Sequence, residues 1–135
     1  MATAPNGHLV LIVEDNEKNM KLTRDVLKFH GFATVEATNG EDGVTLARER
    51  KPALILMDIQ LPRMNGIEAL QVLRADARTR AVPVIAVTAS AMTQDRQKIM
   101  AAGFDGYQAK PIDVTQFVAA VREMLDRPSK GEGAR

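Results

Sequence analysis

Ala53-Leu-Ile-Leu-Met-Asp58 is an unbroken apolar run that ends in a carboxylate. Two nearly continuous apolar runs, Leu9 to Val13 and Val82 to Val87, lie before and after it in the chain. Strands of a parallel sheet read as continuous apolar runs, because helices cover both of its faces. We therefore predict that these three segments are interior strands of one parallel sheet.

Two further strand-like segments, Thr34 to Ala37 and Asp105 to Ala109, mix polar and apolar residues, as strands at the edge of a sheet do. All five segments alternate with helix-like stretches, a pattern typical of α/β proteins. Placing the two mixed strands outermost gives the order 2-1-3-4-5. The sequence thus predicts a doubly wound, five-stranded parallel sheet of the flavodoxin-like kind.

Helix signals stand between the predicted strands. Leu22, Val26 and Phe29 recur at i, i+4 and i+7, and they predict the apolar face of the first helix, with Gly31 as its C-terminal cap. Capping-box spacing marks the starts of two later helices, at Asn65 with Glu68 and at Asp113 with Gln116.

Composition narrows the class of protein. With 135 residues, 45% of them hydrophobic, the chain fits one domain, which we place at residues 9–126 between a flexible leader (1–8) and a disordered tail (127–135). A net charge of +1 favours neither nucleic acid nor membrane as a partner, and we interpret Arg74, Arg78 and Arg80 as a solvated face. The absence of cysteine excludes thiol catalysis and zinc-thiolate sites. Without a signal peptide or spanning segment, we predict a cytoplasmic protein.

Polar residues follow four of the predicted strands. Strand 1 leads into Glu14 and Asp15, strand 3 into Asp58, strand 4 into Thr88 and strand 5 into Lys110. In an open parallel sheet these carboxyl ends meet at one crevice, where ligands bind. Clustered carboxylates need a counter-ion, and ligation by oxygen alone suits Mg²⁺ or Mn²⁺. We predict that Asp58 accepts a phosphoryl group whose charge Lys110, Thr88 and the metal stabilise.

Each of these residues also has a structural interpretation. Asp15 can cap the first helix, and Asp58 can be a turn residue before Leu61-Pro62. The joint pattern of acids, hydroxyl and amine at the ends of adjacent strands favours the functional interpretation over these separate ones.

Four segments of the chain resemble the signature segments of bacterial response-regulator receiver domains. They are Leu11-Ile-Val-Glu-Asp-Asn16, Leu56-Met-Asp-Ile-Gln-Leu-Pro-Arg-Met-Asn-Gly66, Val87-Thr-Ala-Ser90 and Tyr107-Gln-Ala-Lys-Pro111. The resemblance extends from about Leu9 to Leu125. Within this family, the chain is further similar to the single-domain DivK-like receivers.

The resemblance implies a site. Asp58 would take its phosphoryl group from a histidine kinase or a histidine phosphotransfer protein. Asp15, Asp58 and the Gln60 carbonyl would ligate Mg²⁺, with Glu14 assisting through water. Lys110 would contact the phosphoryl group.

The resemblance also implies an output. Thr88 and Tyr107 would form the conformational switch pair, and the Lys110-Pro111 bond would be cis. Phosphorylation would then change how the face made by helix 4, strand 5 and helix 5 binds a downstream protein. We expect a monomer or weak dimer that acts as a phosphoacceptor rather than as an enzyme.

Two other classes of protein remain as alternatives. A phosphatase of the haloacid-dehalogenase kind uses the same residue types, but it carries a second aspartate where this chain has Gln60, so a leaving-group proton has no obvious source. A phosphorylation-independent adaptor would have a degenerate site, whereas all five site residues are present here. Incubation with acetyl phosphate and Mg²⁺ separates the three classes.

Overall fold

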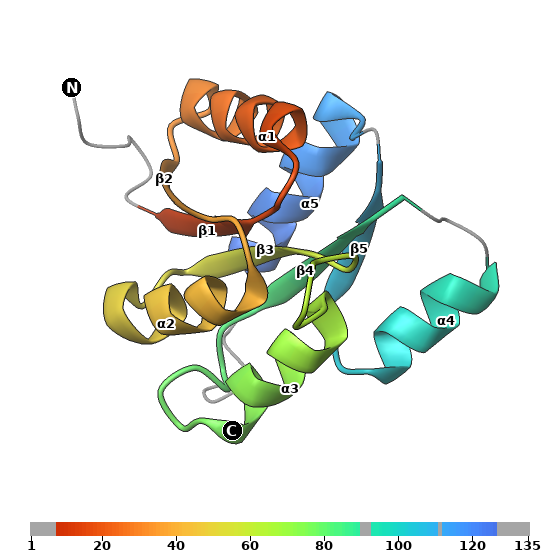
Figure 1. Cartoon of the computed structure of the whole chain (residues 1–135). Coiled ribbons are helices and arrows are strands. Elements are labelled where there is room, and N and C mark those ends of the chain that lie inside the picture. Colours follow the sequence, from red (N-terminus) through yellow and green to blue (C-terminus); the bar gives the residue numbers. More distant parts are fainter. Residues whose placement is uncertain (1–7, 90–92, 111, 127–135) are drawn as a thin grey trace.

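The computed structural model describes residues 8–89, 93–110 and 112–126, within which five strands alternate with five helices (Figure 1). The strands are β1 (Leu9–Val13), β2 (Ala33–Ala37), β3 (Leu54–Asp58), β4 (Val84–Thr88) and β5 (Gly106–Ala109). The helices are α1 (Glu17–Phe29), α2 (Gly40–Arg50), α3 (Gly66–Ala75), α4 (Thr93–Ala101) and α5 (Val114–Asp126). All strands pair in parallel in the order β2-β1-β3-β4-β5, which confirms the predicted sheet.

The sheet separates two hydrophobic clusters. Helices α1 and α5 cover one face, where Leu27 and Phe117 are fully buried against β1, β3 and β4 (Figure 1). Helices α2, α3 and α4 cover the other face, where Leu70 and Ile99 pack against the opposite sides of the same strands. Because β1, β3 and β4 are covered on both faces, nearly all their residues are buried, as their apolar runs predict.

Two strands extend one residue further than their apolar runs. Asp58 pairs with Val87, and Thr88 pairs with Ala109, so both polar residues belong to the sheet ladder rather than to the loops after it. Their backbones are therefore fixed by the sheet, which orients their side chains at its carboxyl edge.

The predicted apolar face of α1 is confirmed only at Val26, which packs against the cluster that α1 and α5 cover. The helix buries Met20, Thr23 and Leu27, whereas Leu22 is 41% and Phe29 85% exposed. Thr23 interrupts the stripe that faces the core, so the unbroken apolar period of its neighbours marked the outer stripe instead. Sequence periodicity thus located the helix but not the side that the sheet covers.

The predicted helix ends are largely confirmed. Asn65 and Glu68 form a complete capping box at α3, and the Asp113 side chain accepts a hydrogen bond from the Gln116 N–H at the start of α5. Gly31, just after α1, has a left-handed φ of 91°, the conformation that favours glycine after a helix. These caps satisfy N–H and C=O groups that the helices themselves leave unpaired.

The prediction that Arg74 belongs to a solvated face is wrong. Its guanidinium donates to the Val82 carbonyl at 2.7 Å and to Asp105 Oδ2 at 2.8 Å. The same Asp105 oxygen accepts the Val84 N–H at 2.8 Å. Arg74 therefore joins α3 to the starts of β4 and β5, a long-range role that local sequence does not reveal.

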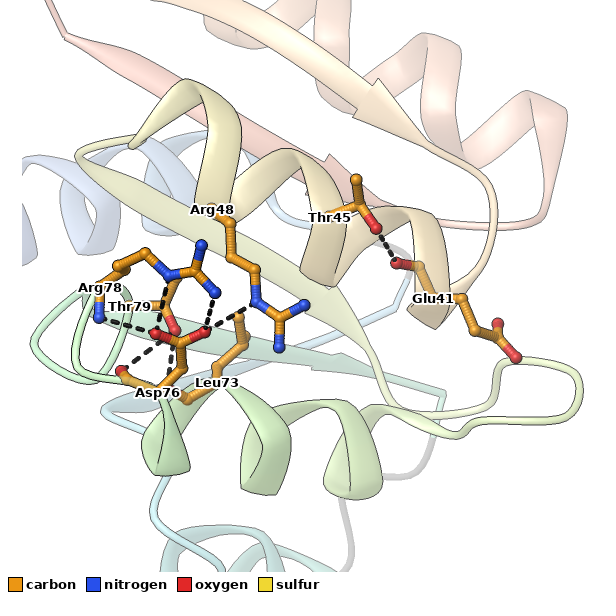
Figure 2. Close-up of polar contacts among 7 residues, drawn as sticks. All are labelled: Glu41, Thr45, Arg48, Leu73, Asp76, Arg78 and Thr79. Carbon is orange, nitrogen blue, oxygen red and sulfur yellow. Dashed lines mark hydrogen bonds and ion pairs between the residues drawn. The ribbon is translucent and has the colours of Figure 1, made fainter.

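A second ion cluster lies at the same end of the sheet, where Asp76 ends α3 (Figure 2). Its carboxylate accepts hydrogen bonds from Arg48 Nε of α2 at 2.8 Å and from Arg78 Nη2 at 2.8 Å. Beneath it the fully buried Thr79 hydroxyl donates to the Leu73 carbonyl at 2.7 Å. The hydrogen bonds of Asp76 hold the ends of α2 and α3 together. They lie at the end of the sheet opposite to Glu14, Asp15 and Asp58.

The limits of the predicted domain are only partly covered by the described residues. His8, assigned to the flexible leader, accepts a backbone hydrogen bond from Ala33 N–H at 3.0 Å and so joins the sheet. The predicted tail, 127–135, lies outside the described residues. Within the residues that are described, no helix has the length and apolar character needed to cross a membrane.

Asp76 should make the stability of the fold depend on pH. Hydrogen bonds from the Arg78 side chain and backbone, and then from Arg48, hold the pKa of Asp76 well below its ordinary value. A lowered folded-state pKa gives a contribution that is complete above the unfolded pKa of about 4 and is lost as pH falls toward the folded one. The difference in free energy of unfolding between wild type and Asp76→Asn should therefore be constant from about pH 7 to 5 and shrink below about pH 4. Urea unfolding measures it, and the exposed Asp126→Asn is the control. A difference that persists unchanged down to about pH 3 would show that Asp76 does not ionise as described.

Candidate functional site

Three carboxylates meet at the carboxyl edge of the sheet. Glu14 and Asp15 follow β1, and Asp58 is the last residue of β3. Val13 pairs with Met57, so β1 and β3 end side by side. Oxygen atoms of the three carboxylates lie within 4.8 Å of one another, with Glu14 and Asp58 buried and Asp15 exposed. Sequence reasoning predicted this grouping from the ends of the apolar runs.

Lys110 supplies a positive charge between two of these acids. Its ammonium lies 3.0 Å from Glu14 Oε1 and 3.1 Å from Asp58 Oδ2. Burial alone would lower the pKa of Lys110, but the hydrogen bonds to Glu14 and Asp58 outweigh it and raise that pKa. Lys110 is therefore a protonated donor that is already aimed at Asp58.

Glu14 sits in a less favourable environment. Burial raises the pKa of its carboxyl, the Asn16 N–H lowers it through a 3.0 Å hydrogen bond, and the negative charge of Asp58 raises it again. The net effect is a raised pKa, because burial together with the charge of Asp58 outweighs the hydrogen bonds from the Asn16 N–H and Lys110. A divalent cation would relieve the remaining repulsion, and oxygen ligands suit Mg²⁺ or Mn²⁺.

The backbone after β3 holds Asp58 in place. Gln60 N–H donates to Asp58 Oδ1 at 3.0 Å, and Gly66 N–H donates to the Ile59 carbonyl at 2.9 Å. The loop from Gln60 to Asn65 thereby closes onto the end of the strand. A Cβ atom at Gly66 would lie 2.4 Å from the Asp58 carbonyl oxygen, so only glycine allows this closure.

Thr88 and Tyr107 lie on neighbouring strands of the sheet. Thr88 is buried at the end of β4, and Tyr107 is half-buried on β5 opposite Ala86. Because side chains alternate along a strand, Ala86 and Thr88 share one face, and so do Tyr107 and Ala109. Ala86 and Ala109 carry only methyl groups, so no bulky side chain from these two strands separates Tyr107 from Thr88.

The predicted site residues divide into three groups. Glu14, Asp15, Asp58 and Lys110 are brought together as predicted, with Thr88 at the end of the adjacent strand. Ligation through the Gln60 carbonyl stays a prediction, although the Gln60 N–H does contact Asp58. Pro111 lies outside the described residues, so the predicted cis bond at Lys110-Pro111 stays a prediction as well.

Sequence reasoning missed two contributors to the site. Gly66 follows the predicted helix cap Asn65, and its position directly after a cap was the available signal. Arg96 of α4 places its guanidinium carbon 5.0 Å from the centre of the Tyr107 ring. No local pattern pairs these two residues, because α4 and β5 meet only in the folded chain.

The acidic site and the strand order together define a receiver. The chain belongs to the response regulator receiver domain family, whose model matches residues 10–122. It is thus a phosphoacceptor of two-component signalling rather than a catalytic enzyme, and the family pairs with histidine kinases. Family membership decides against the phosphatase alternative.

Among its relatives are polar-differentiation response regulators DivK from Brucella species. Those of Brucella anthropi and Brucella abortus are each 47% identical over 116 residues, which are 86% of this chain and 94% of the relative. The chain is therefore a DivK-like response regulator, as the sequence resemblance indicated.

Solved structures with the same fold agree. A response regulator from Chloroflexus aurantiacus has a TM-score of 0.85 at 26% identity, over 89% of this chain and 98% of that one. The receiver domain of a sensor histidine kinase from Pseudomonas aeruginosa has a TM-score of 0.83 at 31% identity with the same coverage, and it holds a magnesium ion in its active site cleft.

Replacing Gly66 by alanine should loosen the acceptor loop. The new methyl group cannot occupy its ideal place against the Asp58 carbonyl, and such overpacking against a rigid backbone costs about 1–3 kcal/mol. We expect the free energy of unfolding of Gly66→Ala to fall by that amount in urea denaturation.

Gly106→Ala is the matched control, because a Cβ there would meet its nearest neighbour, Met124 Cε, at an ordinary 3.4 Å. Equal stability of Gly66→Ala and Gly106→Ala would mean that the close approach at Gly66 is not a constraint.

Proposed function

We propose that Asp58 is the residue that accepts the phosphoryl group, from phosphohistidine of a kinase or a histidine phosphotransfer protein in the cytoplasm. The receiver domain would comprise residues 9–126. Phosphorylation would then signal through the surface formed by α4, β5 and α5, which we call the output face.

One observation carries the choice of Asp58. Among the three acids of the site, Asp58 alone is a residue of the sheet ladder, paired with Val87 of the strand that ends in Thr88, and Lys110 Nζ donates to its carboxylate at 3.1 Å. A phosphoryl group on Asp58 would thus be covalently attached beside a fixed cation and at the edge where β4 presents the Thr88 hydroxyl. Asp15 is exposed, and both Glu14 and Asp15 follow β1, which β3 separates from β4 and Thr88, so neither has the same surroundings.

In the phosphoryl transfer, the protein mainly positions the reacting groups and stabilises charge. A carboxylate oxygen of Asp58 attacks phosphorus, and the P–N bond of the donor breaks, with its electron pair returning to the donor imidazole. Lys110 stabilises the charge that spreads over the phosphoryl oxygens, and the Thr88 hydroxyl is placed to donate to one of them. Lys110 would exchange its present contact with Asp58 for one to the new phosphoryl group.

Mg²⁺ is the cofactor that the site fits. Glu14, Asp15 and Asp58 offer hard oxygen donors, and the related receiver from Pseudomonas aeruginosa holds magnesium in its active site cleft. We propose that Asp15 and Asp58 bind the ion directly, with the Gln60 carbonyl, and that Glu14 acts through water. The bound ion would supply positive charge to the phosphoryl oxygens.

The output would depend on Thr88 and Tyr107. If Thr88 is drawn toward the phosphoryl group, the methyl groups of Ala86 and Ala109 leave Tyr107 room to turn inward from β5. The inward turn would change the shape of the output face and hence its affinity for a downstream protein, since a partner shifts the balance only as far as it binds the two states differently.

Asp58→Asn should abolish phosphorylation. The amide is nearly isosteric with the carboxylate but is not a nucleophile, so the fold should persist while acetyl phosphate with Mg²⁺ no longer adds a phosphoryl group. Intact-protein mass spectrometry measures the adduct, and circular dichroism checks the fold. Asp126→Asn, at the exposed end of α5, should be labelled like wild type. Labelling of Asp58→Asn at wild-type yield would assign the acceptor to another residue.

Mg²⁺ should stabilise the fold through Asp15. At 100 times its dissociation constant, a ligand that binds only the folded state adds about 2.7 kcal/mol. Thermal unfolding with and without Mg²⁺ should show this gain in wild type and lose most of it in Asp15→Ala. Glu49→Ala, which removes an exposed acid of α2 far from the site, should keep the full gain. No response of wild type to Mg²⁺ would refute the proposed metal site.

A further inference from the structure

The Tyr107 ring is held from the side that faces α4. Tyr107 is half-buried and packs against the cluster on the face that α2, α3 and α4 cover. The exposed Arg96 of α4 reaches over the ring, with its guanidinium carbon 5.0 Å from the ring centre. A cation within about 6 Å of an aromatic face is attracted by the electrons of the ring.

Along the sheet toward Thr88, the two strands offer little that would hold the ring. Its neighbours in that direction are Ala86, a member of the same cluster, and Ala109, whose methyl groups make weak individual contacts. Among the residues that the structure describes, Arg96 is thus the one directional partner of the ring, and only methyl groups of β4 and β5 stand between the ring and Thr88. Any turn of Tyr107 toward Thr88 must give up the contact with Arg96.

We propose that Arg96 is a positioning residue that holds Tyr107 in its half-buried position beside α4 and so sets the fraction of molecules in the phosphorylation-competent state. This inference rests on the proposed roles of Asp58, Thr88 and Tyr107. A cation–π contact at an exposed site changes an equilibrium constant by about 2- to 5-fold. Arg96 would thus be a modest bias on the switch, large enough to alter signalling and too small to lock it.

The effect of Arg96 on Tyr107 should be measurable as a change in ligand affinity at Asp58. When only a fraction of molecules is competent to bind a ligand, the apparent dissociation constant is the intrinsic one divided by that fraction. Loss of Arg96 raises the inward fraction, so a phosphoryl mimic at Asp58 should bind more tightly although Arg96 never touches it. The coupling is reciprocal, because occupancy at Asp58 and release of Arg96 favour the same state.

The test uses beryllofluoride, a small complex with the shape and charge of a phosphoryl group, titrated with Mg²⁺ into the full chain by calorimetry. Arg96→Ala should lower its apparent dissociation constant by about 2- to 5-fold. Arg96→Lys, which retains a cation with a weaker affinity for aromatic faces, should fall between Arg96→Ala and wild type. Lys98→Ala removes a charge from an exposed position of the same helix and should match wild type.

A second readout comes from the ring itself. Tyr107 is the only tyrosine and the chain has no tryptophan, so intrinsic emission reports on this residue alone. Beryllofluoride should change that emission, and in Arg96→Ala the change should reach half its amplitude at a correspondingly lower concentration. Urea unfolding should leave the stability of Arg96→Ala close to that of Lys98→Ala, since both side chains are exposed.

The outcomes separate the two levels of the argument. Equal dissociation constants for wild type, Arg96→Ala and Lys98→Ala would overturn the role of Arg96 while leaving the acceptor site intact. An equal gain in Lys98→Ala would also overturn it, because net charge rather than ring contact would then be responsible. If wild type fails to bind beryllofluoride, or Asp58→Asn binds it as well, the proposed function falls, and the role of Arg96 falls with it.

Discussion

Repulsion between carboxylates at one edge of the sheet is the constraint on which the site depends. The parallel register ends β1 and β3 together, so Glu14, Asp15 and Asp58 are brought within 4.8 Å by the fold itself. Lys110, which follows β5, forms ion pairs with Glu14 and Asp58, while burial and then the charge of Asp58 keep the pKa of Glu14 raised. The remaining negative charge gives the edge its chemistry, because it attracts a divalent cation and leaves Asp58 beside a fixed ammonium.

The sheet could be predicted from the sequence because a strand that is buried on both faces is a continuous apolar run. The runs that end in Asp58 and Thr88 are apolar at almost every position, which required interior strands, and the carboxyl ends of such strands must share an edge. The errors have a common cause as well. Leu22 and Phe29 form the more regular stripe of α1, but the sheet selects the stripe that Thr23 interrupts. Arg74 looks like a surface residue until Asp105, 31 positions away, meets it.

The site itself was predicted unevenly for the same reason. Acids and amine at strand ends follow from strand order alone, and they were found. Gly66 and Arg96 matter through contacts made only when a loop closes on β3 and when α4 lies on β5. Such contacts have no period and no fixed spacing, so the position of Gly66 after a helix cap was a weak signal, and no local signal pointed to Arg96.

Ion pairs and buried contacts are distributed unevenly among the helices. An ion pair between Arg48 and Asp76 joins α2 to the end of α3, and Arg74 joins α3 to the starts of β4 and β5. By contrast, Ile99 is the one buried residue among the described side chains of α4. A displacement that begins at Asp58, as we propose, would therefore meet fewer buried contacts at α4 than at α2 and α3. In the proposed switch, α2 and α3 would be the fixed frame against which the output face moves.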